Sequence, residues 1–183
     1  YAGLRRGKVV TLDWSAIDMI GTILHVERSA EMLRNTTRVK EGAKSDAGVR
    51  LIPMCETLYA ALCLHDKNER TGYVCKSATG HLLSPSAFDR GWESFLASME
   101  RAFNGFPAAL DDLLAGDRAK IKALKEKGEW KQFLVRPHDL RHTFATALYI
   151  SGIGIKEAQY YLGHNDIKTT MDVYTHLTPQ TMG

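Results

Sequence analysis

The sequence predicts an α+β protein that is mainly helical and contains one small three-stranded antiparallel sheet. Short segments rich in β-branched residues, separated by polar turns, run through residues 17–53 and are typical of strands. Segments that place apolar residues at helical spacing follow from residue 84 onward. The length of 183 residues and the hydrophobic fraction of 44% suit one globular domain.

The first third of the chain is expected to hold a helix, three strands and a second helix. Residues 3–13 predict the first helix. The three strands are expected at residues 20–27, 36–40 and 49–52, where β-branched side chains alternate with polar turns. The next helix is expected to begin within residues 53–56.

The middle of the chain predicts one more short strand, at residues 73–76, and then a long helix. Ser84 is a suitable N-cap and Pro85 is tolerated in a first helical turn, so the helix is expected to begin there. Its apolar stripe at helical spacing is expected to be buried. That stripe consists of Phe88, Trp92, Phe95 and Met99.

Residues 104–134 separate the long helix from the C-terminal part of the chain. Gly and Pro near residue 105 end the helix, and a leucine-rich and then a charged stretch follow, so we expect a helical insertion. Helices are then expected at residues 137–150, 155–162 and 166–174, with Gly163 ending the second of them.

The composition sets few limits on function. A net charge of +3 neither requires nor excludes a nucleic-acid partner. Cys55, Cys63 and Cys75 lack the CxxC spacing of metal or redox sites, so we expect reduced, buried thiols of a cytoplasmic protein. No apolar run is long enough to span a bilayer.

The C-terminal residues contain a set of groups suited to phosphoryl transfer without a metal. His138 and Arg141 are three residues apart and share a helix face. Guanidinium groups bind phosphate oxygens in pairs, and imidazoles donate hydrogen bonds or move protons near neutral pH. His164 and Tyr174 follow, and a tyrosine hydroxyl can attack phosphorus when cations and a proton acceptor are close.

The motifs that carry these residues resemble the tyrosine recombinase (phage integrase) family. The stretch 137–146, PHDLRHTFAT, is similar to that family's second signature box. The stretches 162–170, LGHNDIKTT, and 174–176, YTH, are similar to the remainder of it. The resemblance extends from Arg5 to His176 and is weakest over residues 104–134.

The resemblance implies further site residues upstream. Arg5, in the Gly-Leu-Arg turn near the start, is implied as the second phosphate ligand. The family usually has an acidic residue three positions later, which helps to orient that arginine, and here Lys8 stands instead. A hairpin lysine that protonates the leaving 5′ oxygen is implied at Lys44, with Lys40 as the fallback.

The resemblance also implies an activity. The chain is expected to be a site-specific recombinase that cleaves and rejoins DNA strands through a 3′-phosphotyrosyl intermediate, with no cofactor and no metal. Tyr174 would be the nucleophile, Arg5 and Arg141 with His164 would hold the phosphate, and His138 would assist proton transfer. Its partner would be double-stranded DNA carrying specific recombination sites.

The same resemblance implies a setting and an assembly. Residues 1–183 would form a catalytic domain that is N-terminally incomplete, with the family's N-terminal DNA-binding domain outside this chain. Family members act as a tetrameric synapse on DNA, whereas an isolated catalytic domain can be monomeric. A phage or bacterial protein of the nucleoid, in the cytoplasm and not at a membrane, is implied.

Other interpretations of these residues are open from the sequence. His138 and His142 have the HxxxH spacing of zinc sites, with His164 as a third ligand. Arg141 could pair with a nearby carboxylate and Tyr174 could fill the core. A type IB topoisomerase uses similar groups, and an inactive DNA-binding protein could retain them.

Overall fold

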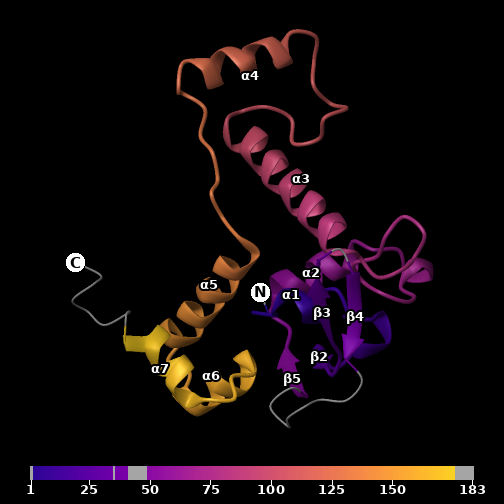
Figure 1. Cartoon of the computed structure of the whole chain (residues 1–183), viewed down its shortest axis with the longest axis vertical. Helices are drawn as coiled ribbons and strands as arrows, with labels where there is room; N and C mark the ends of the chain where they lie inside the picture. Colours follow the sequence, from indigo (N-terminus) through magenta and orange to yellow (C-terminus); the bar gives the residue numbers. More distant parts are fainter. Residues whose placement is uncertain (1, 35, 41–48, 176–183) are drawn as a thin grey trace. The chain divides into compact units, whose positions relative to one another are not determined.

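The structure is a computed structural model that describes residues 2–34, 36–40 and 49–175 (Figure 1). Its contacts divide the chain into two compact units. The first unit joins Tyr1–Pro85 to Pro137–Gly183, and the second unit is Ser86–Arg136. The fold is α+β and mainly helical, as the sequence predicts.

The first unit contains the predicted three-stranded antiparallel sheet, in the order β1-β2-β5. Strands β1 (Ile17–Asp18), β2 (Ile23–Val26) and β5 (Arg50–Pro53) form it. Leu24 pairs with Ile52 across β2 and β5, and both side chains are almost fully buried. They belong to the core cluster of this unit, so the sheet has one face in the core.

The predicted membership of the sheet is wrong for residues 36–40. These form β4 (Thr36–Lys40), which pairs with β3 (Ser29–Leu33) in a separate two-stranded sheet. The two strands are joined by a tight connection in which Arg34 has a φ of 52°, so β4 pairs with the strand just before it in the chain. The expected strand 20–27 starts only at Ile23, because the Asp18 carboxylate accepts the backbone N–H groups of Ile20 and Gly21 and closes a turn.

The helices of this half are shorter than predicted. The expected helix 3–13 is only α1 (Arg6–Val9), because Gly3 has a φ of 59° and cannot belong to a right-handed helix. The short 3-10 turn η1 (Trp14–Ala16) precedes β1. Helix α2 (Glu56–Cys63) begins where expected and is followed by the 3-10 turn η3 (Lys67–Glu69). The expected strand at residues 73–76 is reduced to isolated bridges at Tyr73 and Lys76.

The C-terminal helices follow the prediction closely. They are α5 (Pro137–Ile150), α6 (Ile155–Leu162) and α7 (Ile167–Thr175). Helix α7 packs against both α5 and α6, and α6 also packs against β5. These contacts bring the end of α6 next to residues from the N-terminal half of the chain.

The second unit consists of α3 (Pro85–Phe103, whose first residue belongs to the first unit), α4 (Asp117–Glu126) and the segments around them. Glu100 of α3 accepts hydrogen bonds from the indole N–H of Trp130 and the backbone N–H of Phe133. The side chain of Trp92 donates to the carbonyl of Val135. Of the apolar stripe that the sequence predicts as buried, Phe95 and Met99 are exposed, whereas Phe88 and Trp92 are half-buried.

The predicted burial of the cysteine thiols is wrong for two of the three. Cys55 and Cys63 are exposed rather than buried, and Cys75 is half-buried; all three are free thiols. None of the helices in the described ranges combines the length and apolar character that a membrane crossing requires.

Gly3 provides a test of how the N-terminal segment is packed. A Cβ at Gly3 would lie 2.2 Å from Cδ1 of Phe144, and the φ of 59° is unfavourable for other residues. Gly3→Ala is therefore expected to lower the free energy of unfolding by about 2–4 kcal/mol, measured by urea denaturation. Gly72→Ala is the control, since it has a φ of 65° but no described heavy atom within 4 Å of the added Cβ. An equal loss in both variants would contradict the packing described for Gly3.

Candidate active site

The site is built on the C-terminal end of helix α6. Gly163 has a φ of 62°, and the N–H groups of Gly163 and His164 donate to the carbonyls of Tyr160 and Gln159, at 2.9 and 3.1 Å. This is the hydrogen-bond pattern of a Schellman C-cap. It leaves the carbonyls of residues 161–163 without backbone donors from the helix itself.

Three arginines from distant parts of the chain donate hydrogen bonds to those three carbonyls. Arg50 Nε donates to the carbonyl of Tyr161 at 2.9 Å. Arg141 Nη2 donates to the carbonyl of Leu162 at 2.5 Å. Arg5 Nη1 donates to the carbonyl of Gly163 at 3.4 Å. The partial negative charge of a helix C-terminus favours cations at this place.

Arg141 is the most firmly held of the three. Its side chain is 4% exposed, and its Nη1 donates to the carbonyl of Gly3 at 2.5 Å. The guanidinium therefore ties α5 to α6 and to the segment just before Arg5. Its partners are carbonyl groups, not the neighbouring carboxylates that the sequence also allowed.

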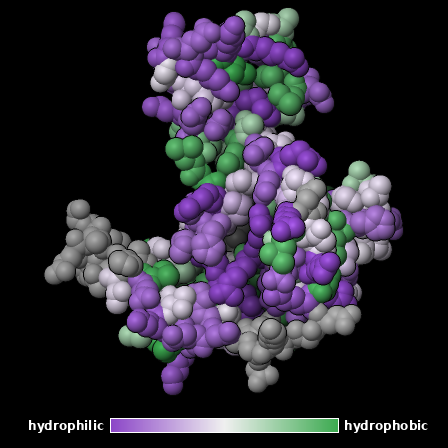
Figure 2. Space-filling model, in the orientation of Figure 1, coloured by the Kyte–Doolittle hydropathy of each residue, from purple (hydrophilic) through white to green (hydrophobic). Residues whose placement is uncertain are grey.

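A pocket of ≈ 120 Å³ lies beside these arginines. Four predicted site residues line it, together with His142 and apolar residues of α5, α6 and α7. The four are Arg5, His138, Arg141 and His164. A cavity needs only about 10–15 Å³ to hold a water molecule, so there is room for a tetrahedral anion. In Figure 2 the surface over α5 and α6 is mostly hydrophilic.

The electrostatics of this pocket favour an anion. Burial, together with Arg5 and Arg50, lowers the pKa of Arg141 to about 9. Burial and the charge of Arg5 lower the pKa of Arg50 to about 10. No carboxylate among the described residues forms an ion pair with any of the three arginines. The cations therefore repel one another until a negative ligand enters.

His164 is held as a neutral donor. Its Nδ1 lies 2.9 Å from Oγ1 of Thr170, and both side chains are buried. Burial, and then the charges of Arg141 and Arg5, lower the pKa of His164 to about 4. At neutral pH the ring can accept the Thr170 hydroxyl at Nδ1, which places the N–H on Nε2 for a ligand in the pocket.

His138 is the more accessible histidine. It is exposed at the start of α5, and its ring meets that of His142 edge to face with centroids 4.8 Å apart. Burial and the His142 and Arg141 charges lower the pKa of His138. A neutral imidazole at this position is able to accept a proton.

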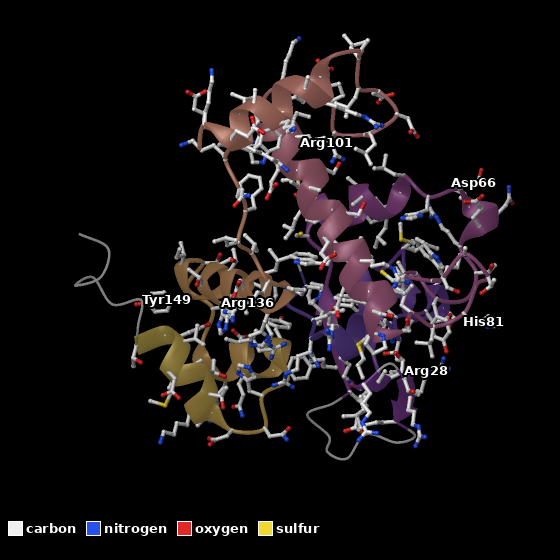
Figure 3. The ribbon with its side chains drawn as sticks, turned by 45° about the horizontal axis from the view of Figure 1, so that its top comes forward. Arg28, Asp66, His81, Arg101, Arg136 and Tyr149 are labelled. Atoms are coloured by element: carbon white, nitrogen blue, oxygen red, sulfur yellow. The ribbon has the colours of Figure 1, made fainter. Side chains whose placement is uncertain are left out.

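The hydroxyl of Tyr174 is not among the groups that line the pocket. It is buried without a hydrogen-bond partner in the described structure, and burial raises its pKa. The Tyr174 ring packs edge to face on Tyr149 of α5, with centroids 4.9 Å apart. Tyr149 is labelled in Figure 3. Thr169 and Val173 of the same helix do line the pocket.

The lysines implied as proton donors to the leaving oxygen are Lys44 and, as the fallback, Lys40. Lys44 lies outside the described residues. Lys40 is on β4 with its Nζ 3.6 Å from a Glu31 carboxylate oxygen, and it does not line the pocket. Lys8 adds to the positive charge, and burial with the nearby Arg50 and Arg5 lowers its pKa. The described hydrogen bond that orients Arg5 is to the Gly163 carbonyl.

The zinc interpretation gains no support from the geometry. Within residues 2–34, 36–40 and 49–175, no three histidine, cysteine or acidic side chains are arranged to hold a metal ion.

A second pocket, of ≈ 160 Å³, is lined by Asp13, Asp18 and Glu27 together with basic residues. Its carboxylates make it less suited to a phosphate.

Sequence reasoning missed two residues, Arg50 and Thr170. Arg50 is only 4% exposed, and the β5 pattern turns Arg50 and Ile52 inward while Leu51 faces out. A buried arginine on a strand indicates a functional or structural role. The sequence does not show that Arg50 is buried, because the apolar Leu51 next to it is an equally good candidate for the inward face. Thr170 lies six residues after His164, and nothing in its spacing marks it as the histidine's partner.

The arrangement described above, on a helical α+β fold, has the charge and the room to accept a phosphate group. Residues 117–181 match the model of the phage integrase family. The chain is 25% identical over 189 residues to a XerC-like tyrosine recombinase of Caldanaerobacter subterraneus, covering 97% of this chain and 44% of that protein. It is also 25% identical to the transposase of transposon Tn916 from Enterococcus faecalis, covering 96% of this chain and 40% of that one.

Solved structures have the same fold. The Tn1549 transposon integrase in complex with transposon right end DNA is similar with a TM-score of 0.63 and 23% identity, covering 99% of this chain and 53% of that one. The XerA recombinase matches with a TM-score of 0.52 and 24% identity, covering 100% of this chain and 50% of that one. The chain thus spans about half the length, or less, of the proteins it matches.

Residues 117–181 thus match the phage integrase family, and over nearly its whole length the chain is similar to tyrosine recombinases.

The burial of His164 predicts a pH dependence of stability. Its pKa is 6.5 in ordinary surroundings and about 4 in the folded protein, so the unfolded chain binds more protons between these values. Stability is therefore expected to fall as the pH is lowered through this window, with His164 contributing on the order of 2 kcal/mol. Equilibrium unfolding of the wild type and of His164→Gln as a function of pH measures this contribution.

The slope should flatten in His164→Gln without vanishing, because the lowered pKa of His138 acts in the same direction. His81→Gln, at an exposed histidine labelled in Figure 3, is the control and should keep the wild-type slope. Equal slopes for the wild type and His164→Gln would show that His164 is not buried as described.

Proposed function

We propose that this chain is the catalytic domain of a site-specific DNA recombinase that cleaves and rejoins strands through a 3′-phosphotyrosyl intermediate. The observation that carries the proposal is the convergence of Arg5 and Arg141 on adjacent carbonyls of α6, beside a pocket that His164 and His138 also line. Two guanidinium groups and a neutral imidazole donor match the charge that develops on a phosphodiester under attack.

The proposed reaction has two balanced halves. The Tyr174 oxygen forms a bond to phosphorus while the bond from phosphorus to the 5′ oxygen breaks. His138 assists removal of the tyrosine proton, and Lys44 supplies a proton to the leaving 5′ oxygen. In the second half the 5′-hydroxyl of another strand gives its proton to Lys44 and its oxygen bonds to phosphorus. The bond from phosphorus to the Tyr174 oxygen breaks, and that oxygen regains a proton from His138, so the scheme needs no metal, nucleotide or other cofactor.

The role of Tyr174 includes a conformational step. Its hydroxyl is enclosed in the structure and burial raises its pKa, which makes it a weak nucleophile in this arrangement. We propose that DNA binding moves α7 and brings the hydroxyl to the phosphate held by the arginines. Cleavage would then be confined to the bound complex, where the ester can be resealed.

The substrate in this proposal is double-stranded DNA with specific recombination sites, and the active assembly is a tetrameric synapse. The similar Tn1549 integrase is described in complex with transposon DNA, which supports this assignment. We propose that residues 104–134, within the second unit, are a helical insertion in a catalytic domain that covers residues 1–183. An N-terminal DNA-binding domain would then belong to the longer protein.

Tyr174→Phe tests the nucleophile. The variant is expected to form no covalent protein–DNA adduct on a nicked suicide substrate, because the attacking oxygen is gone, while its affinity for duplex DNA stays close to that of the wild type. Denaturing gel electrophoresis measures the adduct.

Tyr149→Phe is the matched control, since it removes a hydroxyl from the ring that packs on Tyr174 and should leave adduct formation in place. Adducts in Tyr174→Phe, or their loss in Tyr149→Phe alone, would assign the nucleophile elsewhere. Relaxation of one supercoiled circle without exchange between two duplexes would instead indicate a topoisomerase.

A further inference from the structure

Arg50 is a buried cation that the proposed reaction does not use. It begins β5, is 4% exposed and donates from Nε to the carbonyl of Tyr161 at 2.9 Å. The next residue, Leu51, donates its backbone N–H to the hydroxyl of Tyr160 at 2.9 Å. Strand β5 is thus attached to the last turn of α6 by two neighbouring hydrogen bonds.

The position of Arg50 on α6 matters because the three carbonyls are consecutive. Successive residues of an α-helix are separated by about 100° of rotation and 1.5 Å of rise, so the carbonyls of Tyr161 and Leu162 lie at different places around the end of the helix. With Tyr161 occupied by Arg50, the carbonyls of Leu162 and Gly163 remain for Arg141 and Arg5. At this helix end each guanidinium therefore binds one of the three carbonyls.

Charge gives a second reason why this arrangement is not accidental packing. Burying an arginine without a carboxylate is unfavourable unless its donors are satisfied. Burial and the charge of Arg5 lower the pKa of Arg50, and Tyr160 raises it. Together with burial, the charge of Arg50 in turn lowers the pKa of Lys8, Arg141 and His164. Its charge is therefore part of the field inside the pocket.

We propose that Arg50 is a positioning residue of the phosphate pocket, which by holding the Tyr161 carbonyl fixes the end of α6 and so the places of Arg141 and Arg5. This inference rests on the proposed function for its meaning in catalysis. Arg50 itself does not line the pocket and touches no substrate in this account.

The test compares Arg50→Gln, which removes the charge, with Arg50→Lys, which keeps the charge but loses the guanidinium. Arg70→Gln is the matched control, because Arg70 also donates to backbone carbonyls at a helix end, those of Cys63 and His65 after α2, and does not line the pocket. Thermal unfolding is measured for every variant, so that a general loss of stability is visible.

The first readout is the rate of adduct formation at saturating suicide substrate. Arg50→Gln and Arg50→Lys should both slow it, by roughly 10- to 100-fold. The guanidinium groups of Arg5 and Arg141 would be displaced and would stabilise the charge of the transition state less well. Arg70→Gln should cleave at the wild-type rate. Wild-type rates in both Arg50 variants would overturn the inference, and so would an equal slowing in Arg70→Gln.

The second readout needs no cleavage. Binding of inorganic phosphate and the titration of His164 are followed by NMR. In Arg50→Gln phosphate binding should weaken and the His164 pKa should rise, whereas Arg50→Lys should keep the His164 pKa near that of the wild type. If Arg50→Gln leaves both unchanged, the positioning role fails even when the wild type cleaves DNA. A wild type that forms no adduct, with both shifts present, would instead overturn the proposed function and leave the positioning role standing.

Discussion

The site depends on the end of helix α6. Like charges at close range repel, and the described part of the chain offers the arginines no carboxylate partner. The last carbonyls of α6 replace such partners, because they carry partial negative charge and have no helical donors of their own. Gly163 makes this possible, since its φ of 62° ends the helix and turns the chain away.

This arrangement separates binding from chemistry. Carbonyls hold the guanidinium groups without neutralising their full charge, so the pocket keeps its attraction for a phosphate. The buried His164 remains neutral near pH 7 and its bond to Thr170 links the pocket to α7. The same helix carries Tyr174, whose hydroxyl is enclosed beside Tyr149, so in the proposed mechanism the position of α7 affects both the His164 donor and the Tyr174 nucleophile.

The sequence predicts the C-terminal helices well and the N-terminal strands less well. Helices α5 to α7 carry local signals, such as apolar periodicity and Gly163, that tertiary contacts do not override. The pairing of β4 with β3 depends on a turn at Arg34, and the late start of β2 on the Asp18 side chain, neither of which periodicity reveals. Spacing and family resemblance place Arg5, Arg141, His138 and His164 in one pocket, whereas the burial of Tyr174 and the role of Arg50 arise from packing between distant segments.

The most direct measurement is a crystal structure of the protein with orthovanadate, a mimic of the phosphate in transfer. One vanadate is expected in the pocket, within hydrogen-bond distance of the guanidinium groups of Arg5 and Arg141 and of the His164 ring, with the three arginines still on successive carbonyls at the end of α6. Vanadate bound elsewhere, or Arg5 and Arg141 directed to different sites, would contradict it.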